Sequence, residues 1–408
     1  MNKNAGTKKI EKNNLINNDV FQISSNPPFS KRGIKIALVH DYLVQYGGAE
    51  RVLDSFCELF PEASIYTIAY DKKSMHGHFE GKKIQTSFLQ KIPFARSRHR
   101  MFPVLMPMAI EKFDFSNYDV VLSDSSSFAK GIITGQETLH ICYMHTPMRF
   151  AWDDCQKYTE DFYFPKFIKK LIPFFMNYVR LWDRSSAERP DKIIANSKFI
   201  SRRIKKYYKR DSIVINPPVN VNNFYVSKKQ EDYFLLVGRL MVYKRFDIVI
   251  EAFKQLGLKL KIIGRGPDAE RLKKMAHGYG NIEFLGRLSD KQLFDYYSRC
   301  QAFIFPQEED FGITAIEAMA SGRPLIAFRG GDIPEHMEEG KSGTFFDKQS
   351  SEAIVEAVEK FKNIHFDGEY IRNKVLKFDR EIFKDKIKEF IENETSGFIE
   401  KQMRCFKE

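Results

Sequence analysis

The chain has 408 residues, 43% of them hydrophobic, which is enough for two domains that each enclose a core. Its 65 Lys and Arg against 53 Asp and Glu give a formal net charge of +12, which favours anionic partners: nucleotide phosphates, nucleic acid or an anionic membrane surface. The five cysteines are scattered without a C-x-x-C spacing, which argues against a zinc site or a disulfide framework. No apolar stretch approaches the roughly 20 residues that span a bilayer, so we expect a cytoplasmic protein.

The first part of the chain predicts a tail and then a series of buried strands. Residues 1–33 are rich in Asn and Lys and lack the apolar centre of a signal peptide, so we predict a disordered basic tail. Ordered structure is expected to begin with "IKIALVHDYL" (34–43), followed by a glycine-containing loop and a helical pattern. Four more apolar runs end in polar or proline-containing turns, as buried parallel strands do. These runs are 119–125, 140–147, 192–199 and 212–219.

A second series follows the polar stretch 220–232, which we interpret as a linker. Its apolar runs, separated by helical patterns, are 233–240, 260–267, 282–288, 302–307 and 324–331. The alternation predicts an α/β fold of two doubly wound Rossmann-like domains, at 34–222 and 223–376. We expect them to face each other across a crevice at the carboxyl ends of their strands, where ligands bind in such folds.

The segment "EDFGITAIE" carries two glutamates, Glu309 and Glu317, eight residues apart after a buried strand. A helix is predicted over 313–320, because "ITAIEAMA" is helix-prone and "SGRP" stops it. Carboxylates in the loop and in the helix can accept hydrogen bonds from sugar and ribose hydroxyls. The plainer alternative is that acidic residues stabilise the helix dipole. An anion site is expected at the helix N-terminus, at the backbone amides of Phe311, Gly312 and Ile313.

The segment "VGRLMVYKRFD" supplies the opposite charge through Arg239 and Lys244, which follow a predicted strand. Two fixed cations can neutralise a departing diphosphate without a metal, each charged contact contributing about 1.5–3 kcal/mol. The chain contains no Asp-x-Asp, the motif whose two carboxylates usually bind a metal–diphosphate complex. A solvated basic loop is the alternative interpretation.

Two further segments carry candidate residues. In "GGAE", Gly48 would let the backbone approach a phosphate or sugar, unless the segment is an ordinary turn. In "HTPMRF", His145 ends a predicted strand where a loop would face the crevice, although most single histidines are structural. The "GRG" at 264–266 invites a dinucleotide interpretation, but we assign Gly264 and Gly266 to a turn.

Together, "GGAE", "HTPMRF", "GRL" with "YK", "EDFGITAIE" and "AMASGRPLIAFRGGDIPE" resemble the family-4 retaining glycosyltransferases, which have the GT-B architecture. The likeness runs from about Ile34 to about Phe346. "YMHTPMRFAWD" with "VGRLMVYKRFD" is most similar to the bacterial subgroup that adds mannose or a related sugar to lipid-linked O-antigen, capsule or exopolysaccharide chains. The likeness implies that a C-terminal helical tail, 377–408, packs back on the first domain.

The resemblance also implies a role for each candidate residue. Positions matching Arg239 and Lys244 hold the diphosphate, and the one matching Glu317 binds ribose. Glu309 would touch the transferred sugar, with the 311–313 backbone close by; Gly48 would approach the donor and His145 the sugar. Glu308 is an additional acid, so Glu309 is chosen by its spacing from Glu317. The resemblance implies a metal-independent hexosyltransferase without a cofactor, whose co-substrate is a sugar nucleotide, GDP-mannose being the expected one.

Other interpretations remain open at this point. The enzyme can instead use another donor, a UDP- or GDP-deoxyhexose, or it can be a GT-B enzyme that is not a transferase, such as an epimerase or phosphorylase. RNA binding is suggested by 197–210, which has seven cations and no acid, but a solvated basic helix is favoured and no nucleic-acid partner is expected. The stretches 90–108 and 164–182 mix cations with large apolar residues, which predicts peripheral binding to an anionic inner membrane surface beside a lipid-linked oligosaccharide acceptor.

Overall fold

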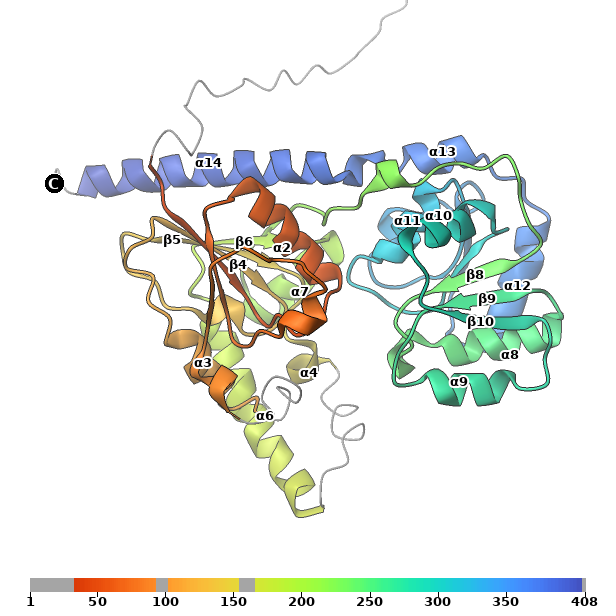
Figure 1. Ribbon diagram of the computed structural model, residues 1–408, viewed down its shortest axis with the longest axis horizontal. Helices are drawn as coiled ribbons and strands as arrows, with labels where there is room; N and C mark the ends of the chain where they lie inside the picture. Colours follow the sequence, from red (N-terminus) through yellow and green to blue (C-terminus); the bar gives the residue numbers. More distant parts are fainter. Residues whose placement is uncertain (1–32, 93–101, 154–165, 406–408) are drawn as a thin grey trace, which may run out of the picture. The chain divides into compact units, whose positions relative to one another are not determined.

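The computed structural model describes residues 33–92, 102–153 and 166–405, and the side chains of the last range only over 172–402. The predicted tail, apart from Gly33, therefore lies outside the described residues, as do much of the stretch 90–108 and the beginning of 164–182. The chain divides into Met1–Ile34 and the compact unit Lys35–Glu408. Both sheets belong to the second unit and can be followed by colour in Figure 1.

The first sheet has seven strands in the order β3-β2-β1-β4-β5-β6-β7. The paired strands are all parallel, so their carboxyl ends lie at one edge. The order reverses between β1 and β4, where His40 and Asp124 are register partners. The strands are β1 (Ile36–His40), β2 (Ser64–Thr67), β3 (Ile84–Thr86), β4 (Val120–Ser125), β5 (Leu139–Met144), β6 (Lys192–Ala195) and β7 (Ile213–Val214).

The second sheet has six parallel strands in the order β10-β9-β8-β11-β12-β13, with the reversal between β8 and β11. The prediction of an α/β fold with two doubly wound parallel sheets is confirmed, and every predicted apolar run overlaps a strand. The strands are β8 (Phe234–Val237), β9 (Leu260–Ile263), β10 (Ile282–Gly286), β11 (Phe303–Phe305), β12 (Leu325–Phe328) and β13 (Gly343–Phe346).

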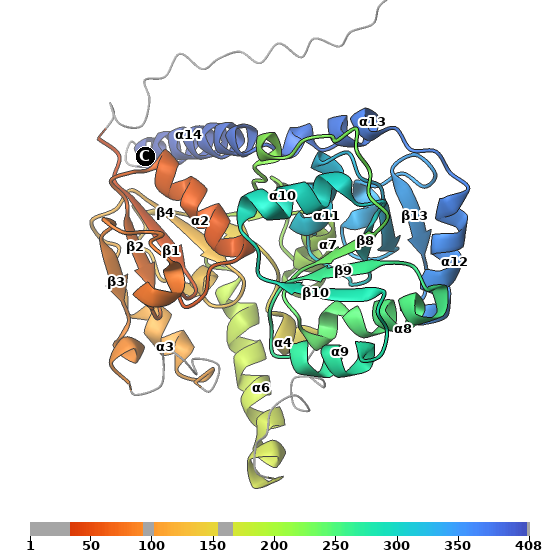
Figure 2. The same cartoon turned by 45° about the vertical axis from the view of Figure 1, so that its right-hand side comes forward.

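Side chains alternate strictly between the two faces of the second sheet. Along β8, Leu235 and Val237 enter one core, whereas Phe234 and Leu236 enter the other. The first core is closed by α10 (Asp290–Arg299) and α11 (Ile313–Ala320). The second is closed by α8 (Phe246–Leu256), α9 (Ala269–Ala276) and α12 (Ser351–Lys362), and Figure 2 shows α10 on one side of the sheet with α8 and α9 on the other. This double burial is what continuous apolar strands require.

The helices of the first half follow its strands. They are α2 (Gly48–Leu59), α3 (Met106–Glu111), α4 (Arg149–Trp152), α6 (Lys166–Ser186) and α7 (Lys198–Tyr208). Short 3-10 turns connect them: η1 (Lys72–Met75), η2 (Phe88–Lys91), η4 (Ala129–Gly131) and η5 (Val221–Asn223). Buried free thiols occur at Cys57, Cys142 and Cys300. Within the described parts of the chain, no helix combines the length and the apolar character that a membrane crossing demands.

The interpreted linker is more firmly packed than its polar composition suggests, because Val221 and Phe224 are buried in a core of the second sheet. Downstream, α13 (Gly368–Asn373) and the 3-10 turn η8 (Leu376–Phe378) lead into the long helix α14 (Arg380–Cys405). On α14, the Phe383 ring stacks on Phe56 of α2 with centroids 5.9 Å apart, and it meets Tyr143 of β5 edge-on at 5.8 Å. Apolar residues of α14 thus help to close the core of the first sheet.

Candidate functional site

The reversal between β8 and β11 brings a cation and a carboxylate together. Lys244, in the 3-10 turn η6 (Val242–Lys244) after β8, places its Nζ 2.6 Å from Oε1 of Glu309, which follows β11. The two side chains are 13% and 21% exposed, so ligand can still reach them. Burial alone would lower the pKa of Lys244, but the Glu309 carboxylate raises it above its ordinary value. The predicted cation and the predicted loop acid therefore form one charged pair.

The neighbouring predicted residues lie around this pair. Arg239 follows β8 directly, and its Nη1 donates to Gln45 Oε1 at 2.7 Å. Glu308, the additional acid, is exposed to solvent. Of the two consecutive glutamates, Glu309 is thus the one that pairs with Lys244.

Helix α11 begins and ends where the sequence predicts, at Ile313 and Ala320. Gly312 precedes it with φ +77°, a conformation that L side chains rarely adopt. A Cβ there would also lie 2.8 Å from Ile333 Cδ1. The Phe311 ring is buried against Phe378, with centroids 5.2 Å apart, which fixes the backbone on the other side. The amides of residues 311–313 are therefore held in one geometry at the helix N-terminus, where an anion is favoured.

Glu317 is nearly buried, at 6% exposure, and both of its carboxylate oxygens accept hydrogen bonds. Arg51 Nη1 of α2 donates to Oε1 at 3.0 Å, and the Tyr297 hydroxyl of α10 donates to Oε2 at 3.0 Å. Burial, reinforced by the carboxylate, raises the pKa of Tyr297 well above its ordinary value, so this hydroxyl stays a donor. The tyrosine orients Glu317 for hydrogen bonding.

The reversal of the first sheet, between β1 and β4, carries a second cluster. His145, the residue after β5, places Nε2 2.5 Å from Asp124 Oδ1, at the end of β4. The other oxygen of Asp124 lies 2.8 Å from Nδ1 of His40, at the end of β1. His40 Nε2 in turn lies 3.6 Å from Glu50 Oε1 in α2. His145 is 12% exposed and is the outermost member.

The predicted residues fall into two groups by their contacts. Gly48, at the start of α2, lies so close to α11 that an added Cβ would stand 3.1 Å from Ile313 Cδ1. Gly48 therefore belongs with Arg239, Lys244, Glu309 and Glu317. His145 stands apart from that group, since its partners among the described residues are Asp124 and Tyr143.

Sequence reasoning missed five polar residues that complete these clusters. The signal in the sequence is weak: two of them end apolar runs, in "VHDY" and "LSDS", and the other three lie on helices α2 and α10. They are His40, Glu50, Arg51, Asp124 and Tyr297.

The basic helix α7, which suggested RNA binding, is mostly solvated but has one inward-facing arginine. Arg203 is 11% exposed and pairs with Asp153 and with Asp310, whose Oδ1 lies 3.1 Å from Nη1. Burial raises the pKa of Asp310 above its ordinary value, although Arg149 and Arg203 oppose this. Asp310 thus serves to hold its loop against α7.

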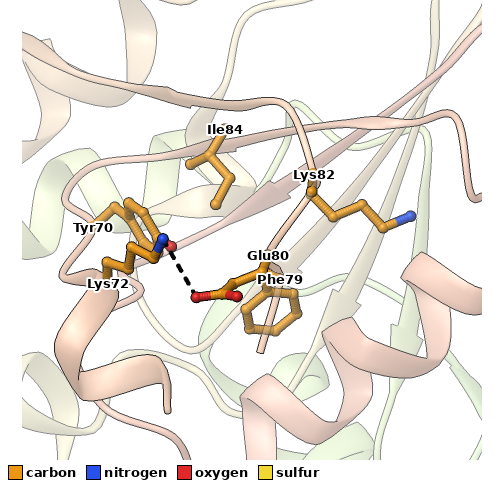
Figure 3. Close-up of a pocket in the computed structure, with 7 residues that line it drawn as sticks. Tyr70, Lys72, Phe79, Glu80, Lys82 and Ile84 are labelled. Carbon is orange, nitrogen blue, oxygen red and sulfur yellow. Dashed lines mark ion pairs between the residues drawn. The ribbon is translucent and has the colours of Figure 1, made fainter. Parts of the chain in front are cut away.

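A surface pocket of about 450 Å³ lies beside β3, away from both clusters (Figure 3). Lys72 and Glu80 form an ion pair across it at 3.3 Å. Its other lining residues are Tyr70, Phe79, Gly81, Lys82 and Ile84. None of the predicted site residues belongs to this lining.

Two doubly wound parallel sheets with polar side chains at both reversals define the GT-B class of fold. Residues 46–223 match the family model described as Glycosyltransferase Family 4, and residues 221–377 match the one described as Glycosyl transferases group 1. The chain belongs to the family-4 glycosyltransferases.

Its relatives include the O-antigen chain mannosyltransferase RfbU of Salmonella typhimurium, 30% identical over 49% of this chain and 58% of that protein. A GDP-mannose-dependent alpha-(1-6)-phosphatidylinositol monomannoside mannosyltransferase of Mycobacterium tuberculosis is 30% identical over 30% of this chain and 36% of that protein. The matched stretches thus span less than two thirds of these relatives. Anabaena Alr3699/HepE, solved with UDP and glucose, superimposes with a TM-score of 0.65 at 16% identity, covering 88% of this chain and 99% of that one, and so supports the fold.

Proposed function

We propose that this protein is a retaining hexosyltransferase that moves mannose from GDP-mannose to a growing, lipid-linked cell-surface glycan. The observation that carries the proposal is the Lys244–Glu309 pair at 2.6 Å, next to the N-terminus of a helix that also holds Glu317. GDP-mannose is named as the donor of one relative, and mannosyl transfer is named for both.

In the proposed reaction, the bond from the anomeric carbon to the diphosphate breaks as an acceptor hydroxyl attacks the same face. The acceptor proton passes to the departing phosphate oxygen. Lys244 and Arg239 stabilise the charge that develops on the diphosphate, together with the amides at the start of α11. An ammonium group has three donors, so Lys244 can hold Glu309 and a phosphate oxygen at once.

Glu309 and Glu317 bind different parts of the donor in this proposal. Glu309, fixed by Lys244, accepts hydrogen bonds from the hydroxyls of the transferred sugar. Glu317 receives the ribose hydroxyls, which replace the hydrogen bond from Arg51 while the one from Tyr297 remains. His145 meets the sugar from the first sheet.

A donor screen tests this function. The melting temperature is measured with GDP-, UDP-, TDP- and ADP-sugars, and release of the nucleotide is then followed in the presence of lipid-linked acceptors. GDP-mannose is expected to give the largest upward shift and to release GDP only with acceptor. A larger shift with a UDP-sugar or a GDP-deoxyhexose would overturn the donor assignment, and conversion of the sugar without nucleotide release would point to an epimerase.

The lipid-linked acceptor is supported by an exposed apolar stripe on α6. Phe174, Tyr178 and Leu181 are 73%, 44% and 65% exposed, whereas Met176 and Val179 of the same helix are buried. Large apolar side chains at helical spacing on a solvated face suit a helix that lies in a membrane interface. Of the basic residues predicted to accompany them, Lys166, Lys169 and Lys170 fall outside the described side chains. Arg180 donates its Nε to the carbonyl oxygen of Ala151 at 2.9 Å.

Peripheral membrane binding is tested by sedimentation with anionic vesicles at low and high salt. The parent protein is expected to sediment at low salt, and Phe174→Ser with Leu181→Ser to stay in the supernatant. Ile213→Ser, at a 49% exposed apolar position on β7, is the matched control and should sediment like the parent. A parent protein that remains in the supernatant at low salt would contradict the membrane assignment.

A further inference from the structure

Behind His145, four side chains form a continuous row from the surface into the first half of the molecule. The row runs from His145 to Asp124 at 2.5 Å, from Asp124 to His40 at 2.8 Å, and from His40 to Glu50 at 3.6 Å. It ends at the "GGAE" turn, where Glu50 Oε2 accepts a hydrogen bond from the backbone N–H of Gly47 at 2.8 Å. Imidazoles and carboxylates alternate along the whole row.

The middle of the row is shielded from water, and His145 is its most exposed member. The side chains of Asp124, His40 and Glu50 are 0%, 3% and 7% exposed, against 12% for His145. Fully buried carboxylates are rare unless their oxygens accept hydrogen bonds, and both oxygens of Asp124 are hydrogen-bonded to histidines here. Asp124 and His40 therefore cannot contact a ligand themselves, and any effect they have on the reaction passes through His145.

The charges within the row fix which atoms carry protons. Burial alone would lower the pKa of His40, but Asp124 and Glu50 raise it to about 10. Burial alone would raise the pKa of Asp124, but His145 and His40 bring it below its ordinary value. An ionised carboxylate only accepts hydrogen bonds, so Nε2 of His145 must carry the hydrogen between them. Which ring nitrogen of a histidine carries a proton is set in this way by the bond that it makes.

We propose that Asp124, backed by His40 and Glu50, is a positioning residue that holds His145 with its hydrogen on Nε2 and turns Nδ1 toward the transferred sugar. The part that concerns the sugar rests on the function proposed above. The row also couples the His145 ring to the turn that carries Gly48, so that two donor-facing features of the first half are set by one buried array. A histidine freed from Asp124 would rotate or change tautomer and would lose this alignment.

A double-mutant cycle tests whether Asp124 acts through His145. Initial rates of sugar transfer are measured for the parent, Asp124→Asn, His145→Ala and the double variant. Asp124→Asn is expected to lower kcat about 10- to 100-fold with little change in KM for the donor, by analogy with the loss of a partner that orients a metal-binding histidine. In the His145→Ala background the same substitution should cost less than about twofold. Equal losses in both backgrounds would overturn the proposal.

A matched control separates the loss of His145 positioning from the general effect of removing a buried carboxylate. Asp183 is also 0% exposed and pairs with a buried cation, Lys130, at 2.5 Å. Asp183→Asn is expected to lower the melting temperature, while its kcat stays within about threefold of the parent. A loss of kcat in Asp183→Asn as large as that in Asp124→Asn would mean that the effect is one of folding and would overturn the assignment.

The tautomer of His145 can be determined without an activity assay, by ¹⁵N NMR of the imidazole nitrogens in the parent protein. The His145 signals are assigned by their loss in His145→Ala. A protonated Nε2 is expected, and protonation of Nδ1 alone would overturn the proposal even if Asp124→Asn does not fold. A parent protein that binds no sugar nucleotide and transfers no sugar would refute the proposed function, whereas the NMR measurement would still decide the state of His145.

Discussion

The two strand-order reversals of this protein hold their charged side chains in different ways. At the reversal of the first sheet, Asp124 is fully buried and its partners are arranged in series, with one imidazole reaching the surface. At the reversal of the second sheet, Lys244 and Glu309 are both partly exposed and are paired with each other. The first arrangement is fixed before a ligand arrives. In the proposed function, the second consists of groups that meet the ligand themselves and exchange partners when it binds.

This difference has an energetic basis. Burying an ion without a partner costs several kcal/mol, so a buried row tolerates no change of partner. The Lys244–Glu309 pair is closer to solvent than Asp124, so its members can turn to a diphosphate at a lower cost. Substitutions in the first cluster should therefore affect both stability and function, and those in the second mainly function.

The largest expected effect is at Lys244. Lys244→Ala should lower turnover about 100-fold or more, because a fixed cation that stabilises the leaving diphosphate is lost, while the melting temperature stays nearly unchanged. Steady-state kinetics and thermal unfolding measure the two quantities. Lys254→Ala is the matched control, since Lys254 is 15% exposed and lies 2.8 Å from Glu251. Transfer by Lys244→Ala at the parental rate would contradict the role assigned to this residue.

A second experiment separates the two glutamates. Glu317→Ala should weaken binding of GDP alone about 10- to 100-fold, because hydrogen bonds from ribose to a carboxylate contribute about 1.5–3 kcal/mol. Glu309→Ala should leave GDP affinity within about twofold and lower the rate of transfer. Calorimetric titration of both variants with GDP and UDP gives the affinities. Equal losses of affinity in the two variants would show that the roles are wrongly divided.

The pH dependence of stability tests the buried side of the comparison. Burial alone would lower the pKa of His40, but Asp124 of β4 and Glu50 of α2 raise it from 6.5 to about 10. Between these two pH values the folded protein therefore holds a proton that the unfolded chain has lost. Its contribution to stability is complete below pH 6.5 and is lost as pH rises toward 10. The loss is at most about 5 kcal/mol. Denaturant unfolding across this pH range should give a steeper decline for the parent than for His40→Gln, and parallel curves would refute the assignment.

The smallest expected effect is that of a chelator. Since Lys244, Arg239 and the start of α11 neutralise the diphosphate in the proposed mechanism, EDTA should change the transfer rate by less than about twofold. The rate is measured before and after EDTA, and again with Mg²⁺ or Mn²⁺ restored. Loss of activity on chelation and its recovery with a metal ion would overturn the metal-independent mechanism.

Local sequence patterns predicted much of the fold. The run 302–307 contains β11, and "SGRP" ends α11 after Ala320, because apolar length and helix-stopping residues act locally. Three strands were missed, namely β2, β3 and β13. They have only four, three and four residues, and β3 lies at an edge with all its residues partly exposed, so the apolar signal is faint.

The site divides in the same way. Glu309, Lys244 and Glu317 belong to segments whose spacing carries a signal, and the structure gives each a charged or hydrogen-bonding partner. His40 and Asp124 are 84 positions apart in the sequence and meet only because β1 pairs with β4. Local sequence patterns do not determine the order of strands in a sheet, so the contact between His40 and Asp124 could not be predicted from the sequence.

The packing of Phe383 on Phe56 determines the order in which the two halves can mature during synthesis. These residues are separated by about 330 positions, and a ribosome that adds about 5–20 residues per second needs roughly 15 to 65 s to make the chain between them. Phe378 is the last residue of the buried cluster on one face of the second sheet, so that cluster is complete before Phe383 has been added. The first sheet is made earlier but waits for α14 with part of its apolar surface uncovered. The half that emerges first is therefore the half that finishes last, and it is the one that a chaperone would be expected to protect.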